Sequence, residues 1–214
     1  MDSIYEKRPW LKNYPDGVPQ DLEITSDTAI NDFRRSAVGR PKAPAVYYFD
    51  HVITYGEIDR LSDSLAAAFD AFGIKKGDRI VLDLQNVPQF LVAAYATWKV
   101  GAIVVPVNPM YKENELTYFC QDSGAKLFVI LSEIASALDL SFLKKTKIKK
   151  VVTTSPLDLF PTSMEPPSLL KGIKRKTVSN TVDLLELLEG FRGKSVQDPA
   201  LSPDDVAYLT YTSG

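Results

Sequence analysis

The sequence predicts an α/β fold: a mostly parallel, doubly wound sheet with helices on both faces, an early β-hairpin and an extended N-terminal arm. Two observations carry this prediction. Between residues 79 and 154, strand-like runs alternate with helical segments, and the runs are continuously apolar, as buried parallel strands are. The 214 residues are 45% hydrophobic, which is enough to bury a substantial core. We expect a sheet of about four to six strands.

Composition excludes several classes of protein. The net charge of −2 argues against a nucleic-acid partner, which normally requires a basic excess. The chain has one cysteine, Cys120, so no intrachain disulfide can form, and with a single histidine a His/Cys zinc site is not expected. The first residues lack the basic-then-apolar pattern of a signal peptide, and no apolar run is long enough to span a bilayer. We therefore expect a soluble, cytoplasmic protein.

The first 44 residues predict an arm and a helix. Residues 1–27 mix prolines with aromatic side chains, which favours an extended arm anchored on a surface by those aromatics. From Thr28 to Val38 the apolar spacing is helical, with Asp27 or Thr28 as the N-cap.

Two short β-type runs and a long helix follow. The runs at residues 45–49 and 52–55 flank Asp50-His51, which predicts a hairpin with these two residues as its turn; His51 is interpreted as a turn residue. Thr54 and Glu57 form a predicted capping box, ahead of apolar residues at helical spacing up to Phe72. Gly73 stands where a helix C-terminal cap is expected.

The rest of the α/β core, to residue 154, is expected to alternate strands with helices. We expect four strands, at residues 79–84, 102–107, 126–131 and 149–154. Helices between them are expected from Asn86 to Gly101, from Glu113 to Asp122 and from Glu133 to Leu140.

Residues 155–203 are expected to form an irregular excursion, a helix from Thr181 to Phe191 and a proline-containing linker. The excursion carries a basic run from Lys171 to Lys176 with interleaved leucine and isoleucine. A solvated loop is the favoured interpretation, and peripheral contact of residues 166–178 with an anionic membrane is the alternative.

The last segment, residues 204–214, predicts a strand that opens into a loop of hydroxyl residues and glycine. Tyr211, Thr212, Ser213 and Gly214 follow an apolar run directly. Backbone N–H groups and hydroxyls in such loops commonly contact phosphate oxygens. The pattern lacks the lysine of a Walker loop, and alone it is equally typical of an ordinary turn.

Four other segments, taken together with residues 211–214, favour a phosphate-binding loop over an ordinary turn. They are Ile53-Thr54-Tyr55-Gly56-Glu57-Ile58, Gly77-Asp78-Arg79-Ile80, the run from Trp98 to Pro109 (Trp-Lys-Val-Gly-Ala-Ile-Val-Val-Pro-Val-Asn-Pro) and Asp122-Ser123-Gly124-Ala125-Lys126. In this order and spacing the chain resembles the adenylate-forming superfamily, the AMP-forming acyl-CoA synthetases and their relatives. The N-terminal run from Arg8 to Pro19 is similar to the leader of long-chain fatty acyl-CoA ligases.

The resemblance implies a function and a boundary. It implies an N-terminal part of a long-chain fatty acid–CoA ligase, which joins a fatty acid to coenzyme A through an acyl-adenylate made from ATP. Tyr211, Thr212, Ser213 and Gly214 would begin the phosphate loop, and the Thr212 hydroxyl could assist Mg²⁺. No catalytic residue is assigned in this chain, because in relatives the loop lysine, the acidic metal ligand, the acyl tunnel and the mobile domain lie downstream.

Two alternatives to this interpretation stay open. The acid could be medium-chain, aromatic or linked to a carrier protein, or the chain could be a self-contained, non-catalytic α/β binding domain. If the leading interpretation holds, we expect the fragment to be inactive, with no ATP, Mg²⁺ or coenzyme A bound to it. Its partner would be the missing C-terminal portion of the same chain, and apolar surface bared by truncation could support a homodimer.

Overall fold

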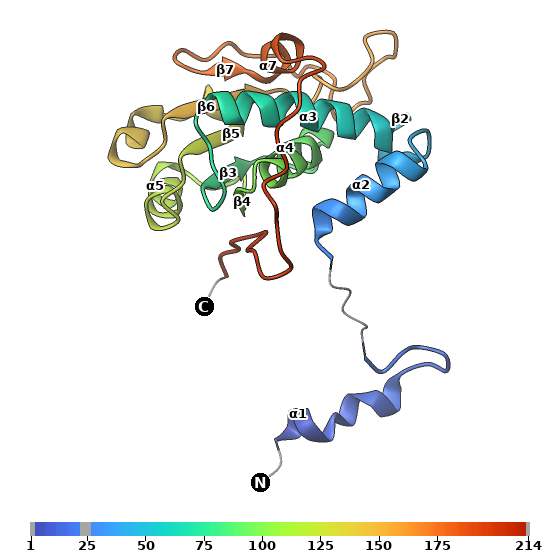
Figure 1. The fold of residues 1–214 in the computed structure, drawn as a ribbon. Coiled ribbons are helices and arrows are strands. Elements are labelled where there is room, and N and C mark those ends of the chain that lie inside the picture. The colour runs from blue at the N-terminus through green and yellow to red at the C-terminus, as the bar shows by residue number, and fades with distance from the viewer. Residues whose placement is uncertain (1–2, 22–26, 213–214) are drawn as a thin grey trace.

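The computed structural model describes residues 3–21 and 27–212, and its main body is a five-stranded parallel sheet (Figure 1). The strand order is β4-β3-β5-β6-β7. The first strand of the sheet, β3, therefore lies in its interior, with β4 on one side and β5, β6 and β7 on the other. The strands are β3 (Arg79–Asp83), β4 (Ile103–Pro106), β5 (Leu127–Leu131), β6 (Lys150–Thr154) and β7 (Val182–Asp183). The predicted parallel α/β sheet is confirmed.

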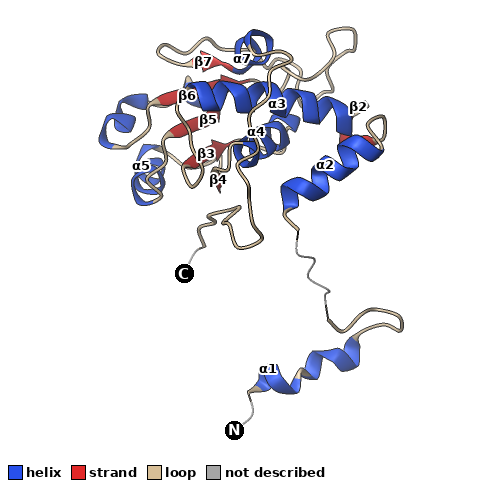
Figure 2. Ribbon diagram, viewed as in Figure 1, coloured by secondary structure: helices blue, strands red, loops and turns tan. Residues whose placement is uncertain are grey.

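Helices cover both faces of this sheet (Figure 2). Along β3, Ile80 and Leu82 belong to the larger core cluster, whereas Val81 between them belongs to a second cluster on the other face. Helices α3, α4 and α7 pack over the first face, and α5 with the 3₁₀ helix η2 over the second. These elements, with the short α6 that follows β5, are α3 (Tyr55–Ala71), α4 (Pro88–Lys99), α5 (Glu113–Asp122), α6 (Ser132–Ala135), η2 (Leu140–Lys145) and α7 (Leu184–Gly190).

Helix α2 (Ala29–Gly39) and a two-stranded sheet precede this core. Thr28 caps α2 by accepting a hydrogen bond from the Asn31 amide, as predicted. The hairpin pairs β1 (Pro44–Tyr48) with β2 (His51–Thr54). Its turn is Phe49-Asp50 rather than Asp50-His51, so the predicted turn was wrong by one residue: His51 pairs with Tyr48, and Phe49 takes the positive φ of 54°.

The capping box at the start of α3 is confirmed. The Glu57 amide donates to the Thr54 hydroxyl, and the Thr54 amide donates to Glu57 Oε2 at 2.8 Å. Hydrogen bonds from Thr54 hold the pKa of the Glu57 carboxyl below its usual value. Gly56 beside them lies so close to Pro41 that an added Cβ would stand 3.1 Å from the Pro41 carbonyl oxygen. The helix therefore starts at a fixed point against the preceding loop.

A partly buried ion-pair cluster joins α3 to α4. The Lys99 side chain is 2% exposed, and its Nζ lies 2.6 Å from Asp59 Oδ1 and 2.7 Å from Asp63 Oδ1. Asp59 and Asp63 are four residues apart on α3, so they repel each other unless a cation stands between them. Lys99 supplies that cation from the last turn of α4, where it also lies 5.9 Å from the centre of the Phe33 ring.

Asp83 is the exception in an otherwise apolar strand. It ends β3, is fully buried, and within the described residues neither carboxylate oxygen has a hydrogen-bond partner. Burial raises the pKa of Asp83 to about 7. The Cys120 thiol on α5 is also buried, and burial together with the Asp83 charge raises its pKa to about 12, so Cys120 behaves as a small apolar side chain, as expected.

Several boundaries differ from the prediction. Helix α4 is capped by Val87 without a side-chain hydrogen bond, so Asn86 is not its cap. The helix expected from Glu133 to Leu140 is only the four-residue α6, and η2 follows it. The helix expected from Thr181 begins at Leu184, because Val182 and Asp183 pair with β6 as β7.

The N-terminal segment, residues 3–21, differs from the extended arm that was expected. It holds α1 (Ile4–Lys7) and the 3₁₀ helix η1 (Pro9–Asn13), and Arg8 pairs with Asp21. Its aromatic side chains, Tyr5, Trp10 and Tyr14, are exposed, so the described structure shows no anchoring by aromatic residues.

Replacing Lys99 tests the ion-pair cluster. We expect Lys99→Met to lower the free energy of unfolding by about 1–3 kcal/mol, because the partly exposed Asp59 and Asp63 would lose their shared cation. The matched control is Lys75→Met, which removes the exposed pair with Asp70 and should cost less than about 1 kcal/mol. Urea denaturation of the three proteins measures both values, and equal effects would refute a special role for the Lys99 cluster.

Asp83 should make stability fall as pH rises. Its folded pKa of about 7 lies above the ordinary value of 3.8, so between these values the unfolded chain has released a proton that the native state retains. The resulting loss is complete above pH 7 and amounts to about 4 kcal/mol, roughly three pKa units at about 1.4 kcal/mol each. Denaturation of the wild type and of Asp83→Leu from pH 4 to 8 measures it. The stability advantage of Asp83→Leu should grow with pH; parallel profiles would show that Asp83 does not carry the effect.

Candidate functional site

The terminal segment lies along the free edge of the sheet beside β4. The Val104 amide donates to the Ala207 carbonyl oxygen at 3.0 Å, and the Leu209 amide donates to the Val104 carbonyl oxygen at 2.9 Å. These bonds make one parallel bridge, between Val104 and Tyr208, so the predicted last strand is reduced to a single paired residue. The Trp98 indole N–H donates to the same Ala207 carbonyl oxygen at 3.0 Å. The segment thus begins as a sixth parallel element.

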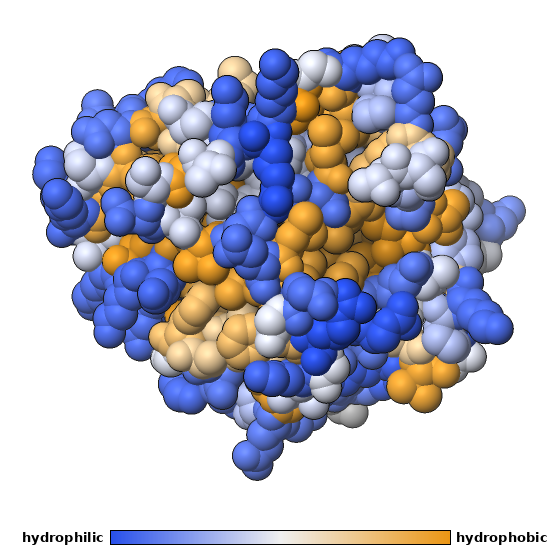
Figure 3. Space-filling model, turned by 90° about the horizontal axis from the view of Figure 1, so that it is seen from above, coloured by the Kyte–Doolittle hydropathy of each residue, from blue (hydrophilic) through white to orange (hydrophobic). Residues whose placement is uncertain are grey.

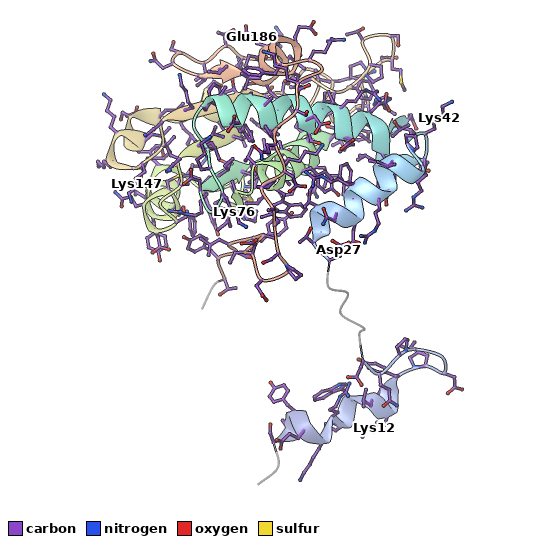
Figure 4. All side chains as sticks on the ribbon, in the orientation of Figure 1. Lys12, Asp27, Lys42, Lys76, Lys147 and Glu186 are labelled. Atoms are coloured by element: carbon purple, nitrogen blue, oxygen red, sulfur yellow. The ribbon has the colours of Figure 1, made fainter. Side chains whose placement is uncertain are left out.

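The approach to this edge is also fixed. The Lys76 Nζ donates to the Ala200 carbonyl oxygen at 3.0 Å and pairs with Asp205 at 2.8 Å, and Figure 4 shows Lys76 where the terminal segment passes the sheet. Gly101 lies underneath with a φ of 74°, and an added Cβ would stand 2.9 Å from the Pro199 Cβ. A side chain at position 101 would therefore push the segment away.

Of the four predicted phosphate-loop residues, the structure describes Tyr211 and Thr212; Ser213 and Gly214 lie outside the described residues. The Tyr211 hydroxyl donates to Asp122 Oδ2 at 2.7 Å, and its ring lies 4.6 Å from the Phe119 ring. Burial, followed by this hydrogen bond, raises the pKa of Tyr211 well above its usual value. Thr212 is exposed. Tyr211 is thus occupied with α5, and Thr212 is the exposed hydroxyl of the described loop.

Three of the segments that carry the resemblance supply turns at the amino edge of the sheet, each with a glycine of positive φ: Gly77, Gly101 and Gly124. The Gly77 amide donates to the Gly101 carbonyl oxygen at 2.9 Å. Arg79 donates to the carbonyl oxygens of Ser123 and Gly124, which ties β3 to the turn before β5. These turns position the starts of β3, β4 and β5.

A second polar cluster lies at the opposite, carboxyl edge, and the sequence reasoning missed it. Gln89 Nε2 donates to the Ser155 carbonyl oxygen at 2.6 Å, and the Ser155 hydroxyl donates to Glu133 Oε1 at 2.9 Å. These residues follow β3, β5 and β6, which are neighbours in the sheet. Ligands of open α/β sheets commonly bind at this edge where the strand order reverses, here between β3 and β5. The sequence feature that could have indicated this cluster was Asp83, an acidic residue inside an apolar run.

The described residues fit only a supporting role toward a metal ion. No group of three His, Cys, Asp or Glu side chains in residues 3–21 and 27–212 is arranged to hold one. Thr212 offers a single hydroxyl ligand. Mg²⁺ in nucleotide sites is commonly held by one or two protein ligands together with phosphates and waters, so one hydroxyl is compatible with such a site but does not define it.

Comparisons with known proteins give a consistent result. The chain is 32% identical over 217 residues to a long-chain-fatty-acid–CoA ligase of Escherichia coli O6:H1, covering 97% of this chain and 38% of that protein. It is 29% identical to the Bacillus subtilis (strain 168) protein of the same name, covering 99% and 39%. The chain therefore spans less than half the length of these relatives.

Solved structures share the fold. A long-chain-fatty-acid-CoA ligase from Archaeoglobus fulgidus superposes with a TM-score of 0.68 at 24% identity, covering 94% of this chain and 37% of that one. An anthranilate CoA ligase in complex with anthranoyl-AMP superposes with a TM-score of 0.69 at 17% identity, covering 90% and 33%. The profile of one protein family, described as AMP-binding enzyme, matches residues 33–214, which include both sheet edges and the terminal segment. The chain belongs to the AMP-binding enzyme family.

Proposed function

We propose that this chain is the N-terminal part of a long-chain fatty acid–CoA ligase. In the whole enzyme a fatty acid carboxylate would attack the α-phosphorus of ATP, which releases pyrophosphate, and the thiol of coenzyme A would then displace AMP. The single observation that carries the proposal is the match along 97% of this chain to a relative of that name. The terminal segment supports it, because it delivers Thr212 to the sheet edge at the start of the expected phosphate loop.

Within this proposal the chain's own residues mainly position the loop. The pairing at Val104 and the Trp98 indole hold the segment before the loop. Thr212, Ser213 and Gly214 would offer hydroxyl and amide groups to phosphate oxygens, and Thr212 would assist Mg²⁺ when ATP is bound. Tyr211 would anchor the loop on α5 through Asp122 rather than contact phosphate.

A second candidate is another adenylate-forming ligase, and one observation favours it. The chain is 27% identical to a 2,3-dihydroxybenzoate-AMP ligase of Bacillus subtilis (strain 168), although over only 75% of this chain. Assays of the complete gene product with coenzyme A and ATP distinguish the two. With a long-chain fatty acid, the complete gene product should form acyl-CoA. With 2,3-dihydroxybenzoate, it should form no adenylate. The opposite preference would favour the second candidate, and a reading frame that stops after Gly214 would favour a self-contained binding domain.

Two expected contacts stay predictions. No described helix is long and apolar enough to cross a membrane. In the segment proposed for peripheral membrane contact, Leu170 is buried and Ile173 packs against the core, which leaves Leu169 as its exposed large apolar side chain. For a homodimer, the candidate surface is a groove of about 940 Å³ between α3, α7 and the hairpin, lined by both apolar and charged side chains, on the face shown in Figure 3. Its floor includes Leu61, Leu185 and Leu188.

The isolated 214-residue polypeptide should form no acyl-CoA. Its described part offers one exposed loop hydroxyl and no lysine to the phosphates, so most charge-assisted contacts to ATP are missing. Incubation of the purified chain with a long-chain fatty acid, ATP, Mg²⁺ and coenzyme A, followed by mass spectrometry, checks this. A product that depends on all four reactants would contradict it.

Gly101→Ala should displace the terminal segment. The new Cβ would meet Pro199 and Lys76, and alanine is strained at a φ of 74°. Because Trp98 bonds to Ala207, its fluorescence should move toward that of a hydrated indole. The matched control is Gly39→Ala, at an open position with ordinary φ, which should leave the spectrum unchanged. An unchanged spectrum in both variants would mean that position 101 does not set the path of the segment.

A further inference from the structure

The buried acceptor atoms that lack a partner are concentrated in one region. Within the described residues, the buried side-chain atoms without a hydrogen bond are both Asp83 oxygens, Gln89 Oε1 and Glu133 Oε2. All four are acceptors, and all lie at or just after the carboxyl ends of β3 and β5. Gln89 and Glu133 meet at Ser155, so each uses one polar atom there and leaves the other unsatisfied.

Residues 156–181, between β6 and β7, close over this region as a cover. The cover leaves the sheet directly after Ser155 and returns beside α6, where the Lys176 amide donates to the Ser132 hydroxyl at 3.4 Å. Phe160 and Leu170 are buried in the larger core cluster. Figure 1 shows the cover as irregular chain along the upper side of the molecule.

The cover has little regular structure of its own. Its backbone hydrogen bonds are local turns, such as Phe160 to Leu157 and Leu170 to Pro167. It contains Pro156, Pro161, Pro166 and Pro167, which lack an N–H. Leu157, Leu159, Met164 and Ile173 also pack against the larger core, so side-chain contacts rather than backbone ladders hold the cover in place. Segments that lack backbone ladders open at lower free energy than the sheet beneath them.

One guanidinium fastens both ends of the cover. Arg175 Nε lies 3.1 Å from Asp158 Oδ1 near the outgoing end, and Arg175 Nη2 lies 2.5 Å from Asp183 Oδ1 just after the returning end. Asp158, whose side chain is 2% exposed, also accepts hydrogen bonds from Thr154 and the Ser155 amide, so it is part of the sheet edge. Asp183 caps α7. Arg175 is therefore bound to fixed groups on both sides.

We propose that residues 156–181 form a hinged cover over the carboxyl edge of the sheet, with Arg175 as its latch. The closed cover leaves the Gln89 and Glu133 acceptors without donors, and a buried acceptor without a donor is costly. Opening admits water to them. The latch and the apolar contacts of Phe160 and Leu170 oppose that tendency and hold the cover closed.

Hydrogen exchange of the 214-residue chain, followed by mass spectrometry, tests the proposal. In Arg175→Ala, amides of the cover and of α6 should exchange about tenfold faster or more, since a charge-assisted bond is lost at each end. Amides of β3 and α5 should keep their rates. Arg175→Lys, which retains the charge but not both contacts, should give an intermediate rise.

Two further variants complete the test. Arg192→Ala is the matched control, because it removes an exposed pair with Glu189 outside the cover, and it should leave the exchange of the cover unchanged. Glu133→Gln has the opposite expected sign: it replaces a carboxylate with one buried, unpartnered oxygen by a neutral amide, which costs less to keep buried, so the cover should exchange more slowly. Faster exchange spread equally over all peptides of Arg175→Ala would make Arg175 an ordinary structural pair and overturn the proposal. Unchanged exchange of the cover in that variant, or no slowing in Glu133→Gln, would overturn it as well.

Discussion

The free edge of β4 is the constraint on which the placement of the terminal segment depends. An unpaired strand edge presents amides and carbonyls that must find partners, and here Val104 bonds to Ala207 and to Leu209. Those two bonds decide the direction in which the chain reaches Thr212. Gly101, where the backbone leaves room for Pro199, and Lys76, which holds Asp205, bring the segment to that edge.

The residues that identify the family serve this arrangement. Gly77, Gly101 and Gly124 allow the loops at the amino edge to turn sharply, and Arg79 ties two of those loops together. Lys99 joins α3 to α4 and so fixes the helix layer that supports β3 and β4.

Local chemistry made the strong elements predictable. The Thr54–Glu57 box and the glycine after α3 involve neighbours in sequence, and the apolar strands have few alternatives in an alternating chain. The hairpin turn was not determined in this way, since pairing Tyr48 with His51 or with Ile53 would place similar side chains toward the core. Strand β7 has two residues, which is too short to leave a pattern.

The site was less predictable because its contacts are long-range. Tyr211 belongs to the predicted loop by pattern, yet its hydroxyl bonds to Asp122, 89 residues earlier, and no local rule anticipates such a contact. Likewise Gln89, Glu133 and Ser155 come together only through the order of the strands. Asp83 was visible as an acidic residue in an apolar strand, but its burial without a partner required the packed structure.

The most direct test of this account is amide hydrogen exchange at Leu209 and Val104 by nuclear magnetic resonance. If the terminal segment pairs with β4 and so positions the start of the loop, both amides should be protected far beyond exposed amides such as that of Thr212. Rapid exchange at Leu209 alongside a protected β3 would show that the segment is not held at the sheet edge, and it would contradict the account.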